Sequence, residues 1–330
     1  MAEPPKFDHL LVIPHLRVQN ANAISSPLTH GFPSITAFLG LMWALERKTQ
    51  AAGMDLRFNA VGVVCHNHQE QVTQGGFVEA FRLTRNPVGR DGSTAAIVEE
   101  GRIHLDISLV FAVQSQGWIT RSADLDEGCA AVADMLQSMR IAGGSVIPSG
   151  AHPRRQKPYV IPLTGSEVDQ DNSFRRARLR LLPGFTLVSR DDLLEARYAE
   201  MQADDASSTR LDAWLSLARI NWTYEPPPED KPNATGTWNH DRTKVGWAVP
   251  IPVGYGALGA THAPGTVTNA RDNSTPFRFV ESLYSVGQWI SPHRIKTARQ
   301  MLWYSDNDPE QGLYRCRNDY QAAPRFAFDF

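Results

Sequence analysis

The sequence is poor in the residues and runs that define several common protein classes. No apolar run approaches the roughly 18 residues that span a bilayer, so we expect a cytoplasmic protein with no membrane segment. The stretch MAEPPKFDH has no basic region followed by an apolar one, so we expect no secretion signal. Only three cysteines occur, which argues against a disulfide framework and for a reducing cytosol: Cys65, Cys129 and Cys316.

Motifs for catalysis and for nucleotide or metal binding are equally scarce. The sequence contains no P-loop, no G-x-G-x-x-G after a predicted strand, no G-x-S-x-G and no H-E-x-x-H. His66 and His68 would share a strand face, but no second pair of ligands follows at zinc spacing. We therefore expect neither catalysis nor a bound metal or other cofactor.

Composition and charge indicate a folded chain with one basic segment. Hydrophobic residues make up 42% of the 330 residues and charged residues 21%, which is typical of a globular protein of one large domain or two ordinary ones. The net charge is −2, but residues 140–190 hold nine Lys/Arg and three acids, so this segment carries +6 and the remainder −8. Such a segment is a candidate footprint for a polyanion, and the alternative is a solvated, Arg-rich face.

Hydrophobic periodicity predicts alternating strands and helices in the N-terminal half. The predicted elements are strand 9–20, helix 35–49 after an N-cap at Ser34, strand 60–66, strand 103–113, helix 121–140 and a short strand at 145–148. We expect residues 75–102 to be an irregular insertion with turns at Asn86-Pro87 and Asp91-Gly92. This order matches the split βαβ pattern of a ferredoxin-like or RNA-recognition fold.

The C-terminal half is less regular. The stretches 150–172 and 223–243 are polar and rich in Pro, Asn and Asp, and we interpret them as loops. The other predictions are helices at 187–201, 210–220 and 277–290, a further helix from Ser291-Pro292 to Tyr304, and a strand at 247–253.

The stretch QNANAISSPLTHGFPS (19–34) concentrates small hydrogen-bonding side chains between the first predicted strand and helix. Such a loop ahead of a helix N-terminus suits phosphate and sugar oxygens. The alternative is that its Asn and Ser side chains satisfy their own backbone. The glycines of AGGS (142–145) either let the backbone approach a ligand or simply end the preceding helix.

Two further stretches are rich in arginine. In FRRARLRLLPGF (174–185), Arg176, Arg178 and Arg180 would line one face of an extended segment, which favours a polyanion or an acidic partner. LTRNPVGRDGST (83–94) places Arg85 and Arg90 in the turn-rich insertion, where a plain hairpin loop is the alternative.

Seven blocks in the same order together resemble one family, the second Csy subunit of type I-F CRISPR surveillance complexes. The blocks are RVQNANAISSPLTHGFPS (17–34), LTRNPVGRDGSTAAIVEEGR (83–102), MRIAGGS (139–145), RLLPGFTLVSR (180–190), GWAVPIPVGYGAL (246–258), TNARDNSTPFRFVESLYSVGQWISPHR (268–294) and LWYSDNDPEQGLYR (302–315).

The resemblance implies a fold of the RAMP superfamily, which is α+β with a ferredoxin-like, RNA-recognition core, an inserted thumb and an α/β C-terminal extension. We divide the chain into a RAMP domain at 1–190, with the thumb at about 67–102, and a helical and mixed region at 191–330 containing a loop at 223–243. The family is not itself the processing nuclease, although some relatives with this fold cleave RNA without a metal. That leaves a histidine-based endoribonuclease, using His15 or His30, as the alternative function.

The resemblance also implies partners. The subunit pairs with the large Csy subunit, and together they hold the 5′ handle of the CRISPR RNA and abut the repeated backbone subunit. Contact with the target DNA duplex near the protospacer-adjacent motif stays open. The residues that we predict to bind RNA, from the residues and the resemblance together, are Arg17, Asn20, Asn22, Ser25, Ser26, Arg85, Asn86, Arg90, Gly143, Gly144, Ser145, Arg175, Arg176, Arg178, Arg180 and Arg271.

Overall fold

The N-terminal half is a strand–helix–strand unit followed by a second one. The computed structural model describes residues 4–85, 87–89, 91–120, 125–148, 157–163, 165–227, 235–241 and 246–322. In chain order the first elements are β1 (His9–Asn22), β2 (Ile24–Ser26), β3 (Thr29–His30), α1 (Ile35–Ala51), β4 (Arg57–Glu70), β5 (Val72–Gly75), β6 (Val78–Arg85), β7 (Ile97–Glu100), β8 (Arg102–Gln114), α2 (Gln116–Thr120), α3 (Leu125–Gln137), β9 (Arg140–Ile141), β10 (Gly144–Val146) and β11 (Tyr159–Pro162). The predicted strands, the helix at 35–49 and its N-cap are confirmed.

The central strands lie in the order β4-β8-β1-β10, and every neighbouring pair is antiparallel. Helices α1 and α3 cover one face, where alternate β8 residues from Ile103 to Phe111 meet Phe38, Leu45 and Val132 in one core. This is the face that the alternation of β8 predicted. The helix predicted over 121–140 is α3, which ends at Gln137, and residues 121–124 lie outside the described residues.

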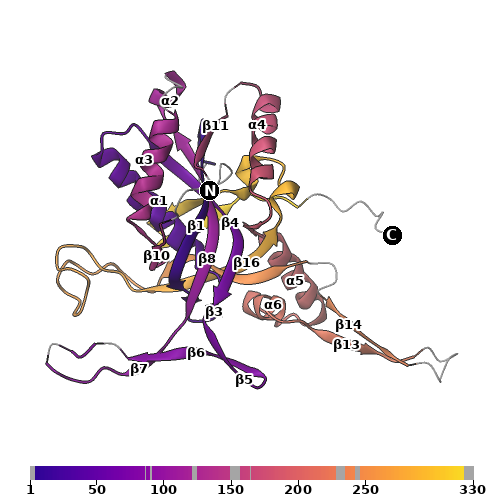
Figure 1. The fold of residues 1–330 in the computed structure, drawn as a ribbon. Helices are drawn as coiled ribbons and strands as arrows, with labels where there is room; N and C mark the ends of the chain where they lie inside the picture. The colour runs from indigo at the N-terminus through magenta and orange to yellow at the C-terminus, as the bar shows by residue number, and fades with distance from the viewer. Residues whose placement is uncertain are drawn as a thin grey trace.

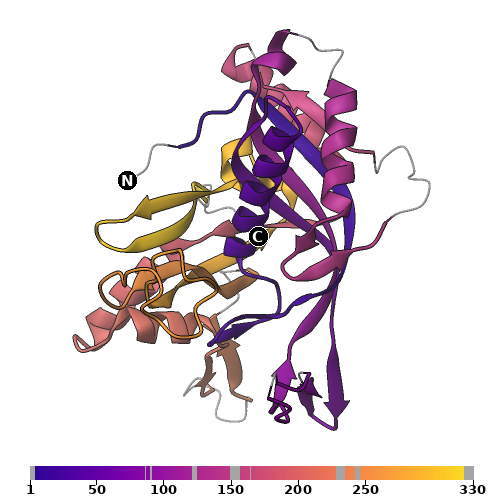
Figure 2. The same ribbon diagram turned by 90° about the vertical axis from the view of Figure 1, so that its left-hand side faces the viewer.

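The insertion between β4 and β8 is ordered rather than irregular, which corrects our expectation for residues 75–102. Strands β5, β6 and β7 pair antiparallel in a small sheet, which we call the thumb. The long strands β4 and β8 run from the body toward it (Figures 1 and 2). At its base, the amide of Gln71 donates to the carbonyl of Arg102 at 2.8 Å. The Asp91-Gly92 turn is present, because the Ser93 amide donates to Asp91 Oδ1 and Gly92 has a φ of 76°.

The C-terminal half extends the same sheet beyond β4. Its elements are α4 (Glu167–Arg180), β12 (Phe185–Ser189), α5 (Asp191–Asp204), α6 (Arg210–Leu217), β13 (Trp222–Glu225), β14 (Thr237–His240), β15 (Ala248–Ala257), β16 (Val280–Ile290), the 3₁₀ turns η4 (Pro292–Arg294) and η5 (Ala298–Met301), β17 (Trp303–Asp308) and β18 (Leu313–Asn318). The described chain thus builds one eleven-stranded sheet, in which β17 and β12 both pair with β4. Helix α4 packs through Phe174 on the face opposite α1, against Leu10, Val64 and Val110.

Several predictions for this half are wrong. The helix predicted at 277–290 is instead strand β16 (Val280–Ile290), and β16 is central, between β12 and β15. Residues 185–189 are a strand, so the helix predicted from 187 begins at Asp191. The segment after Ser291 contains two 3₁₀ turns and then β17 in place of one helix. The helix predicted at 210–220 and the strand predicted at 247–253 are confirmed.

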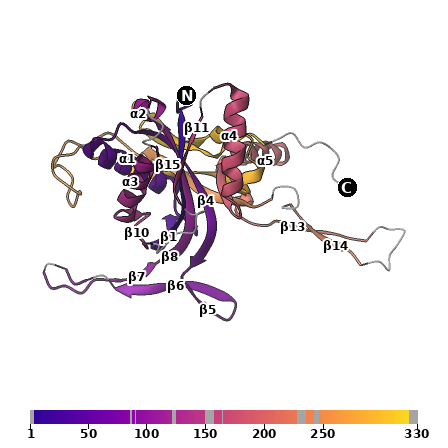
Figure 3. The same ribbon diagram turned by 45° about the horizontal axis from the view of Figure 1, so that its top comes forward.

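The two stretches interpreted as loops contain regular structure. The first holds β11 and the beginning of α4, and residues 149–156 and 164 lie outside the described residues. The second holds the β13–β14 hairpin, with 228–234 and 242–245 outside the described residues. In Figures 1 and 3 this hairpin and the thumb extend away from the body in different directions.

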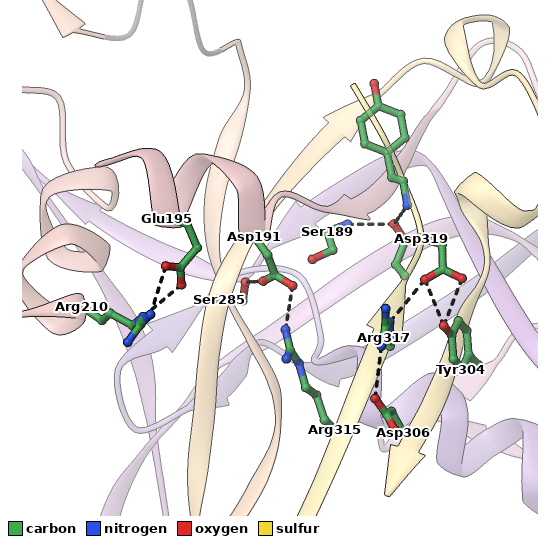
Figure 4. A network of polar contacts seen from close by, with 12 residues as sticks. Ser189, Asp191, Glu195, Arg210, Ser285, Tyr304, Asp306, Arg315, Arg317 and Asp319 are labelled. Atoms are coloured by element: carbon green, nitrogen blue, oxygen red, sulfur yellow. Dashed lines mark hydrogen bonds and ion pairs between the residues drawn. The ribbon is translucent and has the colours of Figure 1, made fainter. Parts of the chain in front are cut away.

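Side-chain contacts fix α5 and α6 to the sheet (Figure 4). Asp191 accepts hydrogen bonds from Arg315 Nη2 at 2.6 Å and from the Ser285 hydroxyl. Glu195 on α5 pairs with Arg210 on α6, with 3.0 Å between Oε1 and Nε. Nearby, Tyr304 donates to Asp319, which also pairs with Arg317. Asp191 thus attaches α5 to the sheet, and Glu195 and Arg210 join α5 to α6.

Within the described residues, the helices are all too short or too polar to cross a membrane. Cys65, Cys129 and Cys316 are free and buried, which agrees with the expectation that they form no disulfide framework. Burial raises the pKa of each thiol to about 12, so all three are protonated and unreactive at neutral pH.

Candidate nucleic-acid interface

Three neighbouring cavities follow the stretch 19–34, and we call them together the loop channel. The first, the polar cavity, has a volume of about 380 Å³ and lies between the main sheet and the thumb. Three arginines from different elements face it, with one glutamate. Its walls are Gln19, Asn20, Gln71, Arg82, Thr84, Glu100, Arg102, Arg140, Gly143 and Ser145.

The second and third cavities continue the channel. The helix cavity, of about 430 Å³, shares Arg140 and Gly143 with the polar cavity and reaches the first turns of α1. The aromatic cavity, of about 380 Å³, shares Ser25, Pro33 and Ser34 with the helix cavity. Adjoining cavities share wall residues, so the three lie in a row beside the 19–34 stretch.

Aromatic rings form the walls of the aromatic cavity. Phe32 meets Trp289 edge-on with 4.9 Å between ring centroids, and Phe185 meets Trp247 at 5.6 Å. Trp247 is 51% exposed, so its ring is accessible for stacking. Polar groups from β4 and from the loop complete the wall, including His30, His68 and Glu70. The His30 Nδ1 lies 3.0 Å from Glu70 Oε1.

Most polar side chains of the 19–34 stretch bond within the stretch itself. Asn22 Nδ2 donates to the Ile24 carbonyl at 2.7 Å, and the Ile24 amide donates back to Asn22 Oδ1. The hydroxyls of Ser25 and Ser26 both meet the Thr29 hydroxyl, at 2.7 and 2.6 Å. The side chains of Asn22, Ser25 and Ser26 therefore satisfy groups of their own loop, as the alternative interpretation of this stretch predicted, and so stabilise its conformation.

Asn20 is placed differently. It has a left-handed backbone with a φ of 57°, and its amide donates to His104 Nδ1 at 3.2 Å. Its side-chain oxygen accepts from Gln71 Nε2 at 2.5 Å. His15 and Ala142 also have positive φ. Left-handed backbone is costly for a residue other than glycine, and the contacts to His104 and Gln71 hold Asn20 in this conformation beside the polar cavity.

The two glycines at 143 and 144 have different reasons to be glycine. Gly143 has a φ of 79°, and a Cβ there would meet nothing within 4 Å, so this backbone is open to a ligand. A Cβ on Gly144 would lie 2.7 Å from the Ala21 amide and 2.8 Å from the Gln19 carbonyl. Gly144 is therefore required by the packing of β10 on β1, while Gly143 and Ser145 line the polar cavity.

The arginines of the polar cavity are mostly ones that sequence reasoning missed. Arg82 and Arg102 come from β6 and β8 and were not predicted, while Arg140 was counted only as part of the basic segment. Arg102 pairs with Glu100 at 3.0 Å, and Arg140 donates to the Gly143 carbonyl at 3.1 Å. Their sequence signal is weak, because each is a single arginine in its own strand and only strand pairing brings the three to one cavity.

The arginine-rich stretch 174–185 is not extended up to residue 180, because it forms the end of α4 and its arginines do not share one face. Arg175 and Arg176 are exposed, whereas Arg178 donates to the Ile295 carbonyl and Arg180 lies 3.5 Å over the Tyr159 ring. Tyr159 pairs with Val12, and Ser145 pairs with Gln19. Along β1, Tyr159 and the polar-cavity residue Ser145 are thus seven residues apart, roughly 23 Å, which places Arg180 away from the polar cavity.

The remaining predicted residues are dispersed. Arg17 is exposed on β1 opposite Asp106, Arg85 ends β6 in the thumb, and Arg271 is exposed in the segment between β15 and β16. Asn86 and Arg90 lie outside the described residues. The structure thus brings together Asn20, Gly143 and Ser145, with Asn22 and Ser25 in the adjoining cavity.

A histidine pair occupies the sheet face opposite α1. His15 and His66 stack with 4.1 Å between ring centroids. His15 Nδ1 lies 3.1 Å from Asp106, while His66 contacts Ser108 Oγ and the Pro183 carbonyl, each at 2.6 Å. Burial lowers the pKa of His66, and the charge of His15 lowers it further, whereas the hydrogen bond to the Pro183 carbonyl raises it. Among the described residues no group of three or more His, Cys, Asp or Glu side chains is arranged to hold a metal ion.

Comparison with known proteins identifies the class. Residues 11–316 match the family model of the CRISPR-associated protein (Cas_Csy2), so the chain belongs to the Csy2 family of type I-F Csy complexes, which serve in antiviral defence. The chain is also 45% identical over 325 residues to the CRISPR-associated protein Csy2 of Pseudomonas aeruginosa (strain UCBPP-PA14), with 96% of each chain covered. The family resemblance of the seven sequence blocks is thereby confirmed.

Proposed function

We propose that this chain is a non-catalytic RNA-binding subunit that holds the 5′ handle of the CRISPR RNA in the loop channel, together with the large Csy subunit, in the cytoplasm. The single observation that carries the proposal is the polar cavity. There, Asn20, Gly143 and Ser145 converge from distant segments on three arginines. Guanidinium groups bind phosphates, and backbone and amide groups suit ribose hydroxyls and base edges.

Two further features of the channel support RNA as its ligand. The Thr84 hydroxyl, on the wall of the polar cavity, is buried and has no hydrogen-bond partner among the described residues. Buried polar groups are normally satisfied, so this hydroxyl is suited to a ligand. The aromatic cavity then offers rings on which an unpaired base can stack.

The order of the strands supports the finer assignment of fold. The succession β1-α1-β4 and β8-α3-β10, paired antiparallel as β4-β8-β1-β10, is the arrangement that a ferredoxin-like RAMP core requires. In this proposal β5–β7 are the RAMP thumb, and the repeated backbone subunit abuts the chain. A role for the target DNA duplex near the protospacer-adjacent motif is not part of the proposal.

The proposal is tested by the salt dependence of guide binding. Full-length chain, with the large subunit added in a parallel series, is titrated against labelled handle RNA from 50 to 300 mM salt. Changing Arg82→Gln and Arg140→Gln together should flatten the plot of log affinity against log salt by about 0.7 for each lost phosphate contact. The exposed pair Arg175→Ala and Arg176→Ala, on α4 and in the walls of none of the three cavities, should have a smaller effect. An unchanged slope in the first variant would remove the polar cavity from the RNA path.

A metal-independent endoribonuclease is the second candidate, and one observation favours it. His15 Nδ1 contacts the Asp106 carboxylate, as a general base held by a carboxylate would. Against it, both ring nitrogens of the adjacent His66 are occupied by Ser108 and Pro183. Incubating the purified chain with repeat RNA separates the candidates. Specific cleavage that His15→Ala or His30→Ala abolishes would defeat the non-catalytic assignment.

A further inference from the structure

The β13–β14 hairpin has one face made of aromatic rings. Strand pairing sets Trp222 opposite His240 and Tyr224 opposite Trp238. The first pair lies 4.7 Å apart between ring centroids and the second 5.3 Å apart. Because side chains alternate along a strand, all four rings share one face. The opposite face carries only polar side chains, namely Thr223, Glu225, Thr237 and Asn239.

This aromatic face is open to solvent. Trp222 is 56% exposed, Tyr224 48% and Trp238 63%. Helix α6, just before the hairpin, also exposes Leu211 and Leu215, which are four residues apart and so lie on one side of the helix. Exposed rings that are gathered on one face are the residue types that anchor protein interfaces. A two-stranded hairpin is marginally stable by itself, so a covering partner would stabilise it.

Hydrogen bonds attach the base of the hairpin to the body. Asn221 fixes its base by donating to the Ser216 carbonyl at 3.1 Å, and the Asn221 amide donates to Asp241 at 3.2 Å. Trp214 Nε1 donates to the Ser285 carbonyl at 2.9 Å, which ties α6 to β16. The Asp191 contacts in Figure 4 hold α5 on the same sheet. The hairpin that carries the rings is therefore joined at its base to α6 and, through α6, to the main sheet.

Charge decides what kind of partner fits. The sequence from 191 to 241 holds eleven acidic and four basic residues, a net charge of −7 in a chain whose total is −2. Arg197 and Arg210 are already paired with Glu200 and Glu195, so they offer no surplus positive charge. Aromatic surfaces that bind single-stranded nucleic acid stand in positive grooves. A surface this acidic repels phosphates and attracts a basic protein surface.

We propose that the aromatic face of the β13–β14 hairpin is a docking surface for a protein partner whose contacting surface is rich in arginine and lysine. The rings accept cations over their faces, and the acidic segment around them provides long-range attraction. The segment 191–241 already contains one cation–π contact of this kind, in which the Arg210 guanidinium lies 4.9 Å from the Tyr198 ring centroid. This surface is separate from the loop channel, and its partner is a protein rather than the guide.

The test measures binding of the full-length chain to each purified Csy subunit and, separately, to handle RNA. The variant combines Trp222→Ser and Trp238→Ser, and the matched control changes Thr223→Ala and Asn239→Ala on the opposite face of the same strands. We expect affinity for one basic subunit to fall about 30-fold in the variant only, as loss of two anchors implies. In the unmodified chain, affinity for that basic subunit should fall as the salt concentration rises. The affinity of the variant for handle RNA should equal that of the unmodified chain.

Three outcomes would overturn the proposal. Unchanged affinity for every subunit would remove the face from the assembly. A fall in RNA affinity would make it a nucleic-acid surface, and a chain that is dimeric only with its tryptophans intact would make it a self-association surface. Circular dichroism and Tm check that each variant is folded, because the changed side chains are exposed.

Discussion

The loop channel and the β13–β14 hairpin both expose aromatic rings, yet their surroundings differ in charge and shape. The rings of the channel stand in the walls of a cavity, and only the helix cavity lies between it and the polar cavity with its three arginines. The rings of the hairpin stand on an open strand face within a segment of net charge −7. The residue type is therefore a poor guide to the ligand, and the neighbouring charge distinguishes a surface for a polyanion from one for a basic protein.

Reversing one charge in the channel should separate the two regions most strongly. Arg140 lines both the polar cavity and the helix cavity. Arg140→Glu replaces a cation for the RNA phosphates with an anion that repels them, so handle RNA affinity should fall about 100-fold. The matched reversal Arg210→Glu on α6 should leave RNA affinity unchanged. Fluorescence anisotropy at fixed salt measures both. Equal losses in the two variants would show that total charge, and not the channel, controls binding.

The two glycines of the channel wall should differ in stability. Gly144→Ala forces a Cβ against the Ala21 amide, and we expect the free energy of unfolding to drop by about 2 kcal/mol. Gly143→Ala meets open space and only strains a left-handed backbone, which should cost about 1 kcal/mol. Urea denaturation compares them. If Gly143→Ala were the more damaging, the structural role assigned to Gly144 would be wrong.

A crossed pair of tryptophan variants sharpens the comparison directly. Trp247→Ala removes a stacking ring from the aromatic cavity and should lower handle RNA affinity about 10-fold. Trp238→Ala, which removes an equally exposed ring from the hairpin, should leave RNA affinity intact and weaken only subunit binding. Both variants are assayed against both ligands. If both variants lost the same affinity for RNA and for the subunit, the assignment of RNA to the channel and of a protein partner to the hairpin would be contradicted.

The smallest expected effect is on pH dependence. Burial lowers the pKa of His66 below its ordinary 6.5, with His15 lowering and Asp106 and the Pro183 contact raising it. Below pH 6.5 the unfolded chain gains a proton that the folded chain resists, so stability should fall as pH drops from 6.5 toward the lowered value. His66→Gln should reduce this fall in Tm between pH 7.5 and 5.0, whereas the exposed His293→Gln should not. An identical pH profile for His66→Gln would contradict this account.

The sequence predicted the N-terminal elements well because their strands have one clearly buried face and helix α1 has a strong N-cap. Ser34 marks the beginning of α1, and β8 alternates from Ile103 to Phe111. Strand β16 was mistaken for a helix because it is central and covered on both sides, which removes the period of two. Its Ser285 and Gln288 are polar yet buried, so the apolar positions that remain resemble a helical stripe.

The candidate site was harder to predict than the fold. Asn20, Gly143 and Ser145 were found because small and glycine residues gather in short stretches of sequence. Arg82 and Arg102 were missed because only the pairing of β6 with β7, and of β8 with β1 and β4, brings them to one cavity. The arginines of α4 were overvalued, because a dense sequence cluster carries no information about distance in space.

The bond between the Gln71 amide and the Arg102 carbonyl closes the main sheet just inside the thumb. Beyond this bond the thumb still contacts the body, because Phe81 packs edge-on against His30 and the Gly101 carbonyl accepts from the Ala23 amide. Arg82, Thr84 and Glu100 also line the polar cavity, so a change of length inside β6 or β7 would displace walls of the channel. Only the connection between β6 and β7 should tolerate insertions, which would extend the tip of the thumb and leave the RNA-facing walls in place.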